Sequence, residues 1–313
     1  MKALKFTTLL LLLIGFLGCK TQNPTLQEKS QTETLAVDRP KSVNVRGETI
    51  HYIEKGNGEP IILIHGAIGD YNAWALQMDT LALNHRAIAI SRRYAWPNQQ
   101  PGPDVSFDCT VALHAKDIVG FMEEMKISSA HLIGHSYGAM IALRTTIDHP
   151  SKVKSLVLGE PGVETMLSGT VKGDSLINDF RTNFDVAVSL YKRGKHEEAV
   201  RQFLITVLGS DEVYDVVPQA VRDGWLQNLV EGICIAETQD LASISHEELS
   251  QIKAPVLLIK GQNSPAYLAT ASDSLNLVLP NSELRLLPNA SHGLQGENPS
   301  EFNKLVVKFL NDN

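Results

Sequence analysis

A series of short apolar runs, separated by stretches with helical spacing, constrains the fold of this chain more than any other feature. Continuous Ile, Val and Leu residues in runs of this length indicate strands buried on both faces, as in a parallel sheet with helices on either side. The sequence therefore predicts an α/β protein with a mostly parallel sheet flanked by helices. The runs lie at residues 61–64, 87–90, 131–133, 153–158, 256–259 and 284–287.

The segments around these runs complete the expected core. Residues 43–46 and 49–54 flank Gly47 and alternate in polarity, which predicts an antiparallel hairpin ahead of the parallel strands. Helices are expected near residues 71–82, 111–125, 137–148, 267–278 and 299–311.

About ninety residues between 161 and 253 lack any strand-like run. Apolar residues recur there at helical spacing, as at Phe184, Val188 and Tyr191. Because strand-like runs resume afterwards, we interpret residues 161–253 as a helical cap inserted into a core formed by residues 43–160 and 254–313.

The first 42 residues differ in composition from the rest. Lys2 and Lys5 precede an apolar run at residues 6–18. As a helix this run is about 20 Å long, shorter than the roughly 30 Å hydrocarbon core of a bilayer. The pattern predicts a signal peptide over residues 1–18. Residues 19–42 are rich in polar residues and proline, which predicts a flexible tether.

The end of the apolar run, Phe16-Leu17-Gly18-Cys19, resembles the lipobox of bacterial lipoproteins, in which cleavage leaves a lipidated N-terminal cysteine. The resemblance implies lipidation of Cys19, export, and anchoring to a membrane of a bacterial cell envelope. A plain secretory signal with an incidental cysteine is the alternative, and it makes the protein periplasmic or secreted.

Charge and cysteine content exclude several classes of function. The formal net charge is -7 and no long Lys or Arg run occurs, which argues against a nucleic-acid partner. Three cysteines are too few for a disulfide framework in a chain of 313 residues, so Cys109 and Cys234 are interpreted as buried thiols. No Cys-x-x-Cys or His-x-x-x-His pair suggests a metal, and no metal or organic cofactor is expected.

One motif contains a candidate catalytic residue. Residues 134–138 read Gly-His-Ser-Tyr-Gly, follow an apolar strand and open a predicted helix rich in small residues. A strand, a sharp turn and a helix form the context that Gly-x-Ser-x-Gly requires, because larger side chains at the two glycines would collide with neighbouring elements. The motif predicts that Ser136 stands above the sheet as a nucleophile, at the N-terminus of a helix.

From about residue 43 to residue 313 the chain resembles the α/β-hydrolase fold family. Residues 65–69, His-Gly-Ala-Ile-Gly, look like the oxyanion loop of that family. The resemblance implies that the backbone amides of Ala67 and Tyr137 stabilise the oxyanion. Amides held next to glycines meet the physical demand for donors fixed where charge develops.

A serine nucleophile needs a base, most plausibly a histidine. His292 follows the last predicted strand, where the family places its catalytic histidine, and it is our candidate. The other histidines near motifs or helices are expected to be structural: His65, His114, His135 and His149.

The catalytic histidine needs an acidic residue to orient it, and the position of that residue here departs from the commonest family pattern. Ser264 stands where many members carry an Asp after the penultimate strand. Glu160, at the end of the strand next to the nucleophile strand, is our candidate, as in family members that place the acid there. A Glu in this position completes the chain order Ser136, Glu160, His292. Asp240 and Asp273 are the alternatives to test.

These residues predict a serine hydrolase that cleaves small carboxylic esters through an acyl-enzyme, with the cap closing the pocket. Ser136 argues against dehalogenases and epoxide hydrolases of this fold, which need an Asp nucleophile. The alternatives are an aminopeptidase or amidase, whose substrate ammonium would need acidic cap residues, and a ligand-binding lipoprotein without activity. The available cap acids are Glu164, Asp174, Glu231 and Glu237, and the candidate pocket residues are His65, Arg92, Arg93 and Trp96.

Overall fold

The computed structural model describes residues 39–98, 100–102, 107–238 and 240–313. The predicted signal peptide, Cys19 and most of the predicted tether lie outside the described residues. Within the described ranges, no helix is both long and apolar enough to cross a membrane.

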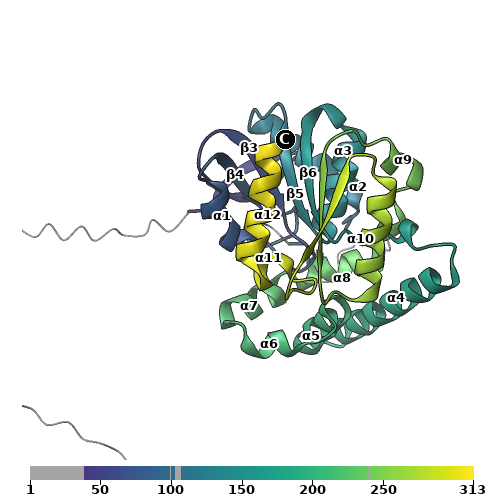
Figure 1. Ribbon diagram of the computed structural model, residues 1–313. Helices are drawn as coiled ribbons and strands as arrows, with labels where there is room; N and C mark the ends of the chain where they lie inside the picture. The colour runs from purple at the N-terminus through teal and green to yellow at the C-terminus, as the bar shows by residue number, and fades with distance from the viewer. Residues whose placement is uncertain (1–38, 99, 103–106, 239) are drawn as a thin grey trace, which may run out of the picture. The chain divides into compact units, whose positions relative to one another are not determined.

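Eight strands form one sheet in the order β1-β2-β4-β3-β5-β6-β7-β8 (Figure 1). The pairs β1/β2 and β2/β4 are antiparallel, and every other neighbouring pair is parallel. The predicted fold class is confirmed. The strands are β1 Lys41–Val45, β2 Glu48–Lys55, β3 Glu59–Ile64, β4 His85–Ile90, β5 Ala130–His135, β6 Val153–Gly159, β7 Val256–Gly261 and β8 Ser282–Leu287.

The start of the first strand differs from the predicted end of the tether. Strand β1 begins at Lys41, so the last two residues of the predicted tether, Lys41 and Ser42, pair with Tyr52 and His51 of β2. Backbone hydrogen bonds of the hairpin extend the strand beyond the alternating side chains on which the prediction rested.

Helices cover both faces of the sheet because alternate residues of the central strands point in opposite directions. On β3, Ile62 and Ile64 pack in the core cluster beneath α2 and α3, whereas Ile61 and Leu63 pack in the cluster beneath α1 and α12. The core helices are α1 Ala75–Leu81, α2 Val111–Glu124, α3 Tyr137–Asp148, α10 Ala266–Val278, α11 Leu294–Glu297 and α12 Pro299–Asp312.

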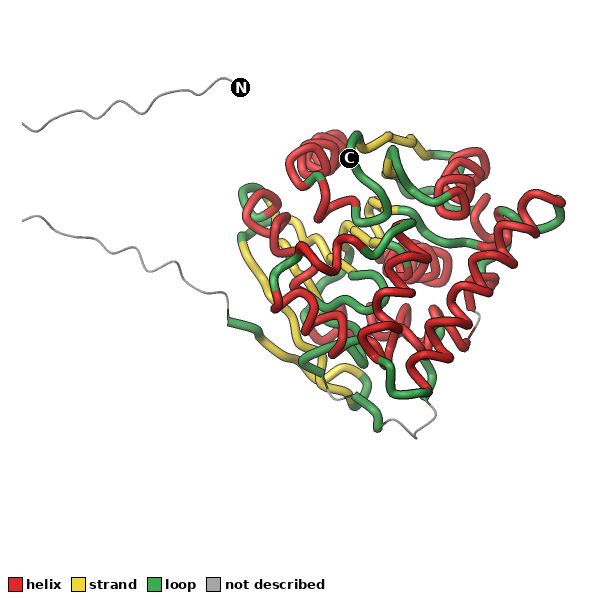
Figure 2. Tube along the Cα trace, turned by 90° about the horizontal axis from the view of Figure 1, so that it is seen from below, coloured by secondary structure: helices red, strands yellow, loops and turns green. Residues whose placement is uncertain are grey.

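Between β6 and β7 the described residues form helices and connecting loops, with an apolar cluster of their own. Figure 1 shows α4 to α8 gathered at one edge of the sheet, and Figure 2 shows them from below, in front of the strands. The longer helices of this segment are α4 Val171–Lys192, α5 His196–Leu208, α6 Glu212–Val216, α7 Gln219–Gln227, α8 Leu229–Thr238 and α9 His246–Ser250.

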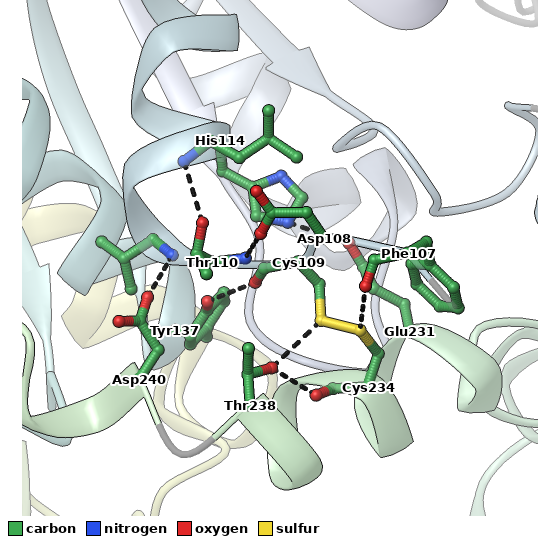
Figure 3. The surroundings of a disulfide bond; sticks show 12 residues. Phe107, Asp108, Cys109, Thr110, His114, Tyr137, Glu231, Cys234, Thr238 and Asp240 are labelled. Carbon is green, nitrogen blue, oxygen red and sulfur yellow. Dashed lines mark hydrogen bonds and ion pairs between the residues drawn. A yellow bond between two sulfur atoms is a disulfide. The ribbon is translucent and has the colours of Figure 1, made fainter.

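The interpretation of Cys109 and Cys234 as free thiols was wrong. The two form a disulfide that joins the segment before α2 to cap helix α8, across 125 residues of sequence (Figure 3). The count of three cysteines excluded a framework of several bridges but not a single bridge. Only the packing of α8 against the start of α2 brings this pair together.

We expect the disulfide to stabilise the fold, because it closes a long loop in the unfolded chain. The paired change Cys109→Ser/Cys234→Ser should lower the free energy of unfolding by about 2 to 4 kcal/mol. Urea unfolding followed by circular dichroism measures this difference, and wild-type protein unfolded in a reducing buffer should match the variant. Equal urea midpoints for the oxidised, reduced and substituted proteins would contradict the expectation.

Candidate active site

The nucleophile motif forms the sharp turn that its sequence predicts. Ser136 lies between β5 and α3 with φ 54° and ψ -121°, a conformation that side chains rarely adopt. Both glycines are required by close approach. A Cβ on Gly138 would lie 2.2 Å from the carbonyl oxygen of Ile64, and one on Gly134 would lie 2.5 Å from Cα of Ala139. The two glycines therefore allow helix α3 to pack closely against strands β3 and β5, and the turn depends on this close packing.

The predicted contact between Glu160 and His292 is present. Nδ1 of His292 lies 2.7 Å from Oε2 of Glu160, and both side chains are almost completely buried. The other carboxylate oxygen, Oε1, accepts a hydrogen bond of 2.8 Å from the amide of Gly261 on β7. Because a carboxylate only accepts, Nδ1 carries the imidazole proton and Nε2 is left as the basic atom.

The alternative partners of His292 are engaged elsewhere. Asp240 accepts a hydrogen bond from the amide of Val111, and Asp273 pairs with Lys260. Oγ of Ser264 is buried and has no hydrogen-bond partner within the described residues. Among the candidates raised by the sequence, Glu160 alone contacts the imidazole of His292.

His135 supports His292 from within the motif. Its Nε2 lies 2.7 Å from the carbonyl oxygen of His292, and the two ring centroids are 4.7 Å apart. Burial lowers the pKa of His135 to about 3, so the ring stays neutral and Nε2 donates to that carbonyl. His135 thus holds the loop of His292 against the nucleophile turn.

The two residues predicted to supply oxyanion donors, Ala67 and Tyr137, line the same cavity as Ser136. Tyr137 is the first residue of α3, so its amide has no acceptor within the helix. Ala67 follows β3, and it lines the same two cavities that Ser136 lines. The hydroxyl of Tyr137 donates a 2.6 Å hydrogen bond to the carbonyl of Cys109, and burial raises its pKa, so it remains protonated.

Ser136 lies between two cavities formed with the cap. The aliphatic cavity has a volume of about 470 Å³, within the usual range of small-molecule sites, and it also contains His292. Its apolar lining includes Leu76, Leu204, Leu208, Val213, Val217 and Val221. The aromatic cavity, of about 60 Å³, is lined by Phe180, Phe184 and Phe203, together with Glu164 and Arg181.

Two cap residues that the sequence had not marked as functional, Phe203 and Val207, line both cavities. They lie four residues apart on α5 and therefore share one face of that helix. The helical spacing of apolar residues was visible in the sequence. It could not distinguish a face packed in a core from a face that lines a cavity.

None of the four candidate pocket residues lines either cavity at Ser136. Arg93 forms hydrogen bonds of 2.7 and 2.6 Å with Asp117, and the ring of Trp96 packs 5.7 Å from that of Tyr71. Arg92 pairs with Glu231. Each arginine side chain forms an ion pair with a carboxylate from another element instead of lining a cavity at Ser136. His65 is the first residue of the oxyanion loop, and its side chain is buried next to the carbonyl of Gly66.

The acidic cap residues are also engaged. Glu164 reaches the aromatic cavity, but its carboxylate pairs with Arg181. Glu237 pairs with Lys192, and Asp174 accepts from the amide of Gly169. Across the described ranges, no group of three or more His, Cys, Asp or Glu residues could hold a metal ion.

Comparisons with known proteins agree with this fold. The chain is 24% identical over 276 residues to a 2-hydroxy-6-oxononadienedioate/2-hydroxy-6-oxononatrienedioate hydrolase of Pseudomonas putida, covering 83% of this chain and 91% of that protein. The solved enol-lactonase from Burkholderia xenovorans LB400 has a TM-score of 0.71 at 21% identity, covering 87% of this chain and 100% of its own. Est816, described as an N-acyl homoserine lactone degrading enzyme, has a TM-score of 0.64 at 24% identity, covering 86% of this chain and 100% of its own.

Residues 59–299 match the family described as alpha/beta hydrolase fold. That match includes the nucleophile turn, the loop of His292, Glu160 and the segment that carries the cavities. The chain is thus an enzyme of the hydrolase class, and it belongs to the alpha/beta hydrolase fold family.

Proposed function

We propose that this protein is a serine hydrolase that cleaves carboxylic esters through an acyl-enzyme. The observation that carries the proposal is the buried hydrogen bond between Glu160 and His292, on the wall of a cavity that also contains Ser136. A serine with an oriented imidazole and nearby backbone donors is equipped for acyl transfer. Fold alone does not supply this argument, since the same fold hosts many reactions.

In the proposed reaction, Oγ of Ser136 attacks the ester carbonyl while Nε2 of His292 accepts the hydroxyl proton. The amides of Ala67 and Tyr137 stabilise the oxyanion. His292 then returns the proton to the departing alcohol, and the acyl group remains on Ser136. Water, deprotonated by His292, attacks the acyl-enzyme, and His292 returns this proton to Oγ of Ser136 as the bond to the acyl group breaks and the carboxylic acid is released. Glu160 stabilises the imidazolium formed in each half of the reaction.

The lining of the aliphatic cavity supports an apolar acyl or alcohol group. Its walls come mainly from Leu and Val side chains of α5 to α7 and their connecting loops, and the carboxylate of Glu297, which also lines it, accepts a hydrogen bond from the hydroxyl of Ser291. A volume of about 470 Å³ accommodates a small or medium-sized ester. The names of two structural neighbours, an enol-lactonase and a lactone degrading enzyme, refer to cyclic esters.

A second candidate is hydrolysis of a dioate such as those named for the Pseudomonas putida relative. Such a substrate would need cationic groups for its carboxylates. Among the described residues, Arg181 is the one arginine that lines either cavity, and it is already paired with Glu164. The same pairing leaves Glu164 unsuited to bind a substrate ammonium, so an aminopeptidase is supported less well than an esterase. Purified protein assayed against p-nitrophenyl esters of graded length, a lactone and a dioate separates these candidates.

We also propose that Cys19 is lipidated and that the protein is exported and anchored to an envelope membrane. The Phe16-Leu17-Gly18-Cys19 pattern supports this location. The disulfide between Cys109 and Cys234 supports it independently, because disulfides persist in oxidising compartments and are rare in the bacterial cytosol.

Replacing the nucleophile should abolish turnover without unfolding the protein. Ser136→Ala should lower kcat by about 10³-fold or more, because no other serine, threonine or cysteine among the described residues lines either cavity. Thermal unfolding should change little, since Ser136 is only half-buried and the change removes a single oxygen atom. Ester hydrolysis and a fluorophosphonate labelling assay measure the two effects. A variant that kept half of the wild-type rate would refute the assignment of Ser136.

The acid is tested by a matched pair of variants. Glu160→Gln keeps the size of the side chain but removes the charge opposite the imidazolium, so kcat should fall by about 10²- to 10⁴-fold. Ser264→Ala is the control at the position where many relatives carry the acid. It should change kcat by no more than about twofold, because its hydroxyl makes no hydrogen bond to His292. A larger loss in Ser264→Ala than in Glu160→Gln would reverse the assignment.

The anchor is tested in cells. Cys19→Ala should abolish incorporation of an alkyne fatty acid and move the protein from the membrane fraction to the soluble fraction or the medium. Specific activity should be retained, because the core begins at β1. Unchanged labelling and unchanged membrane partition would contradict the lipoprotein proposal.

A further inference from the structure

The carbonyl oxygen of Gly66, in the oxyanion loop, is held by three donors. Nη2 of Arg92 lies 3.0 Å away, Nδ1 of His65 lies 2.8 Å away, and the amide of Gly69 lies 3.3 Å away. Three donors on one carbonyl fix the direction in which it points. They therefore also fix the orientation of the peptide unit that contains this oxygen.

The carbonyl of Gly66 and the amide of Ala67 are parts of one planar trans peptide, so C=O and N–H point in opposite directions. Holding the oxygen on the buried side therefore directs the N–H of Ala67 towards the side of Ser136. Rotation of this peptide would withdraw the donor and turn a lone pair towards the developing oxyanion. We infer that Arg92 is a positioning residue that fixes this N–H for catalysis, with Glu231 of the cap as its buried counter-ion.

Arg92 acts on the loop through its backbone as well. Its amide donates a 3.0 Å hydrogen bond to Nε2 of His65. Because Nε2 accepts, the proton of the neutral ring resides on Nδ1, which then donates to the carbonyl of Gly66. Burial and the adjacent charge of Arg92 lower the pKa of His65 well below its usual value, so this tautomer persists.

Glu231 makes the burial of Arg92 possible. The two side chains are 0% and 1% exposed, respectively, and Oε2 lies 2.9 Å from Nη2. A buried guanidinium needs a paired charge, and here the charge comes from cap helix α8. The same nitrogen, Nη2, contacts both Glu231 and the carbonyl of Gly66. The ion pair therefore connects the cap directly to the oxyanion loop.

Helix α8 is held close to this loop by two further contacts. A Cβ on Gly232 would lie 2.4 Å from Cγ2 of Ile68, so the helix nearly touches the loop. Two residues further on, Cys234 forms the disulfide with Cys109, whose carbonyl accepts from the hydroxyl of Tyr137 (Figure 3). The residues of both oxyanion donors thus rest on one buried cluster.

The inference rests on the proposed function, and it must be separated from a purely structural role of the ion pair. Arg92→Met alone leaves the charge of Glu231 buried and unpaired, and it destabilises the protein whether or not Arg92 positions the loop. The double change Arg92→Met/Glu231→Leu removes both charges and leaves none unpaired. Replacing a buried pair by apolar residues of similar size often costs no stability.

The readout is the second-order rate constant for inactivation by a fluorophosphonate, whose phosphonyl oxygen occupies the oxyanion hole. The double variant should unfold near the wild-type midpoint yet react about 10²-fold more slowly, the lower end of the effect of losing one oxyanion donor. With p-nitrophenyl butyrate, kcat should fall similarly and KM should change little. Arg92→Lys, which keeps the charge and a donor, should recover part of the rate.

The neighbouring buried pair provides the matched control. Arg93→Met/Asp117→Leu removes an arginine and an acid that contact neither the oxyanion loop nor the cavities, and its rate of inactivation should stay within about twofold of wild type. Recovery of both stability and reactivity in Arg92→Met/Glu231→Leu would overturn the positioning role and leave the proposed function intact. A wild-type protein that does not react with the probe would overturn the proposed function and the positioning role with it.

Discussion

The close packing of α3 against β3 and β5 is the constraint on which the rest of the site depends. It is possible only because residues 134 and 138 have no side chain, since a Cβ at either position would meet backbone atoms at 2.5 Å or less. This packing holds Ser136 in a conformation with positive φ and leaves the first amide of α3 without an intrahelical partner. The proposed nucleophile and one proposed oxyanion donor are therefore products of the same steric requirement.

The acid reaches the histidine from a neighbouring strand rather than from the usual one. Glu160 directly follows β6 and has a φ of 46°, and its carboxylate spans from the amide of Gly261 on β7 to the imidazole of His292. Because parallel strands end at the same edge of a sheet, the ends of β6 and β7 are interchangeable places from which to reach this loop. Because Glu160 after β6 already contacts His292, no carboxylate is needed after β7. Ser264 can therefore occupy that position.

The cap contributes more than cavity walls. Its helix α8 supplies Glu231 to Arg92 and Cys234 to the disulfide, and both contacts end at residues that carry or support the oxyanion donors. In the proposed reaction, substrate shape and transition-state stabilisation are thereby linked through one helix. On this proposal, a change in the cap alters the rate of the reaction without contacting the substrate.

The sequence by itself determined the layered α/β core, the nucleophile turn and the triad candidates, because each depends on local patterns: continuous apolar runs, two glycines around a serine, and residues at strand ends. Only the tertiary structure decided the disulfide, the partners of Arg92 and Arg93, and the faces of α5 that line the cavities. These depend on contacts between segments more than twenty residues apart in the chain. No local pattern specifies which buried charge finds which partner, because that choice is made by the packing of the cap on the core.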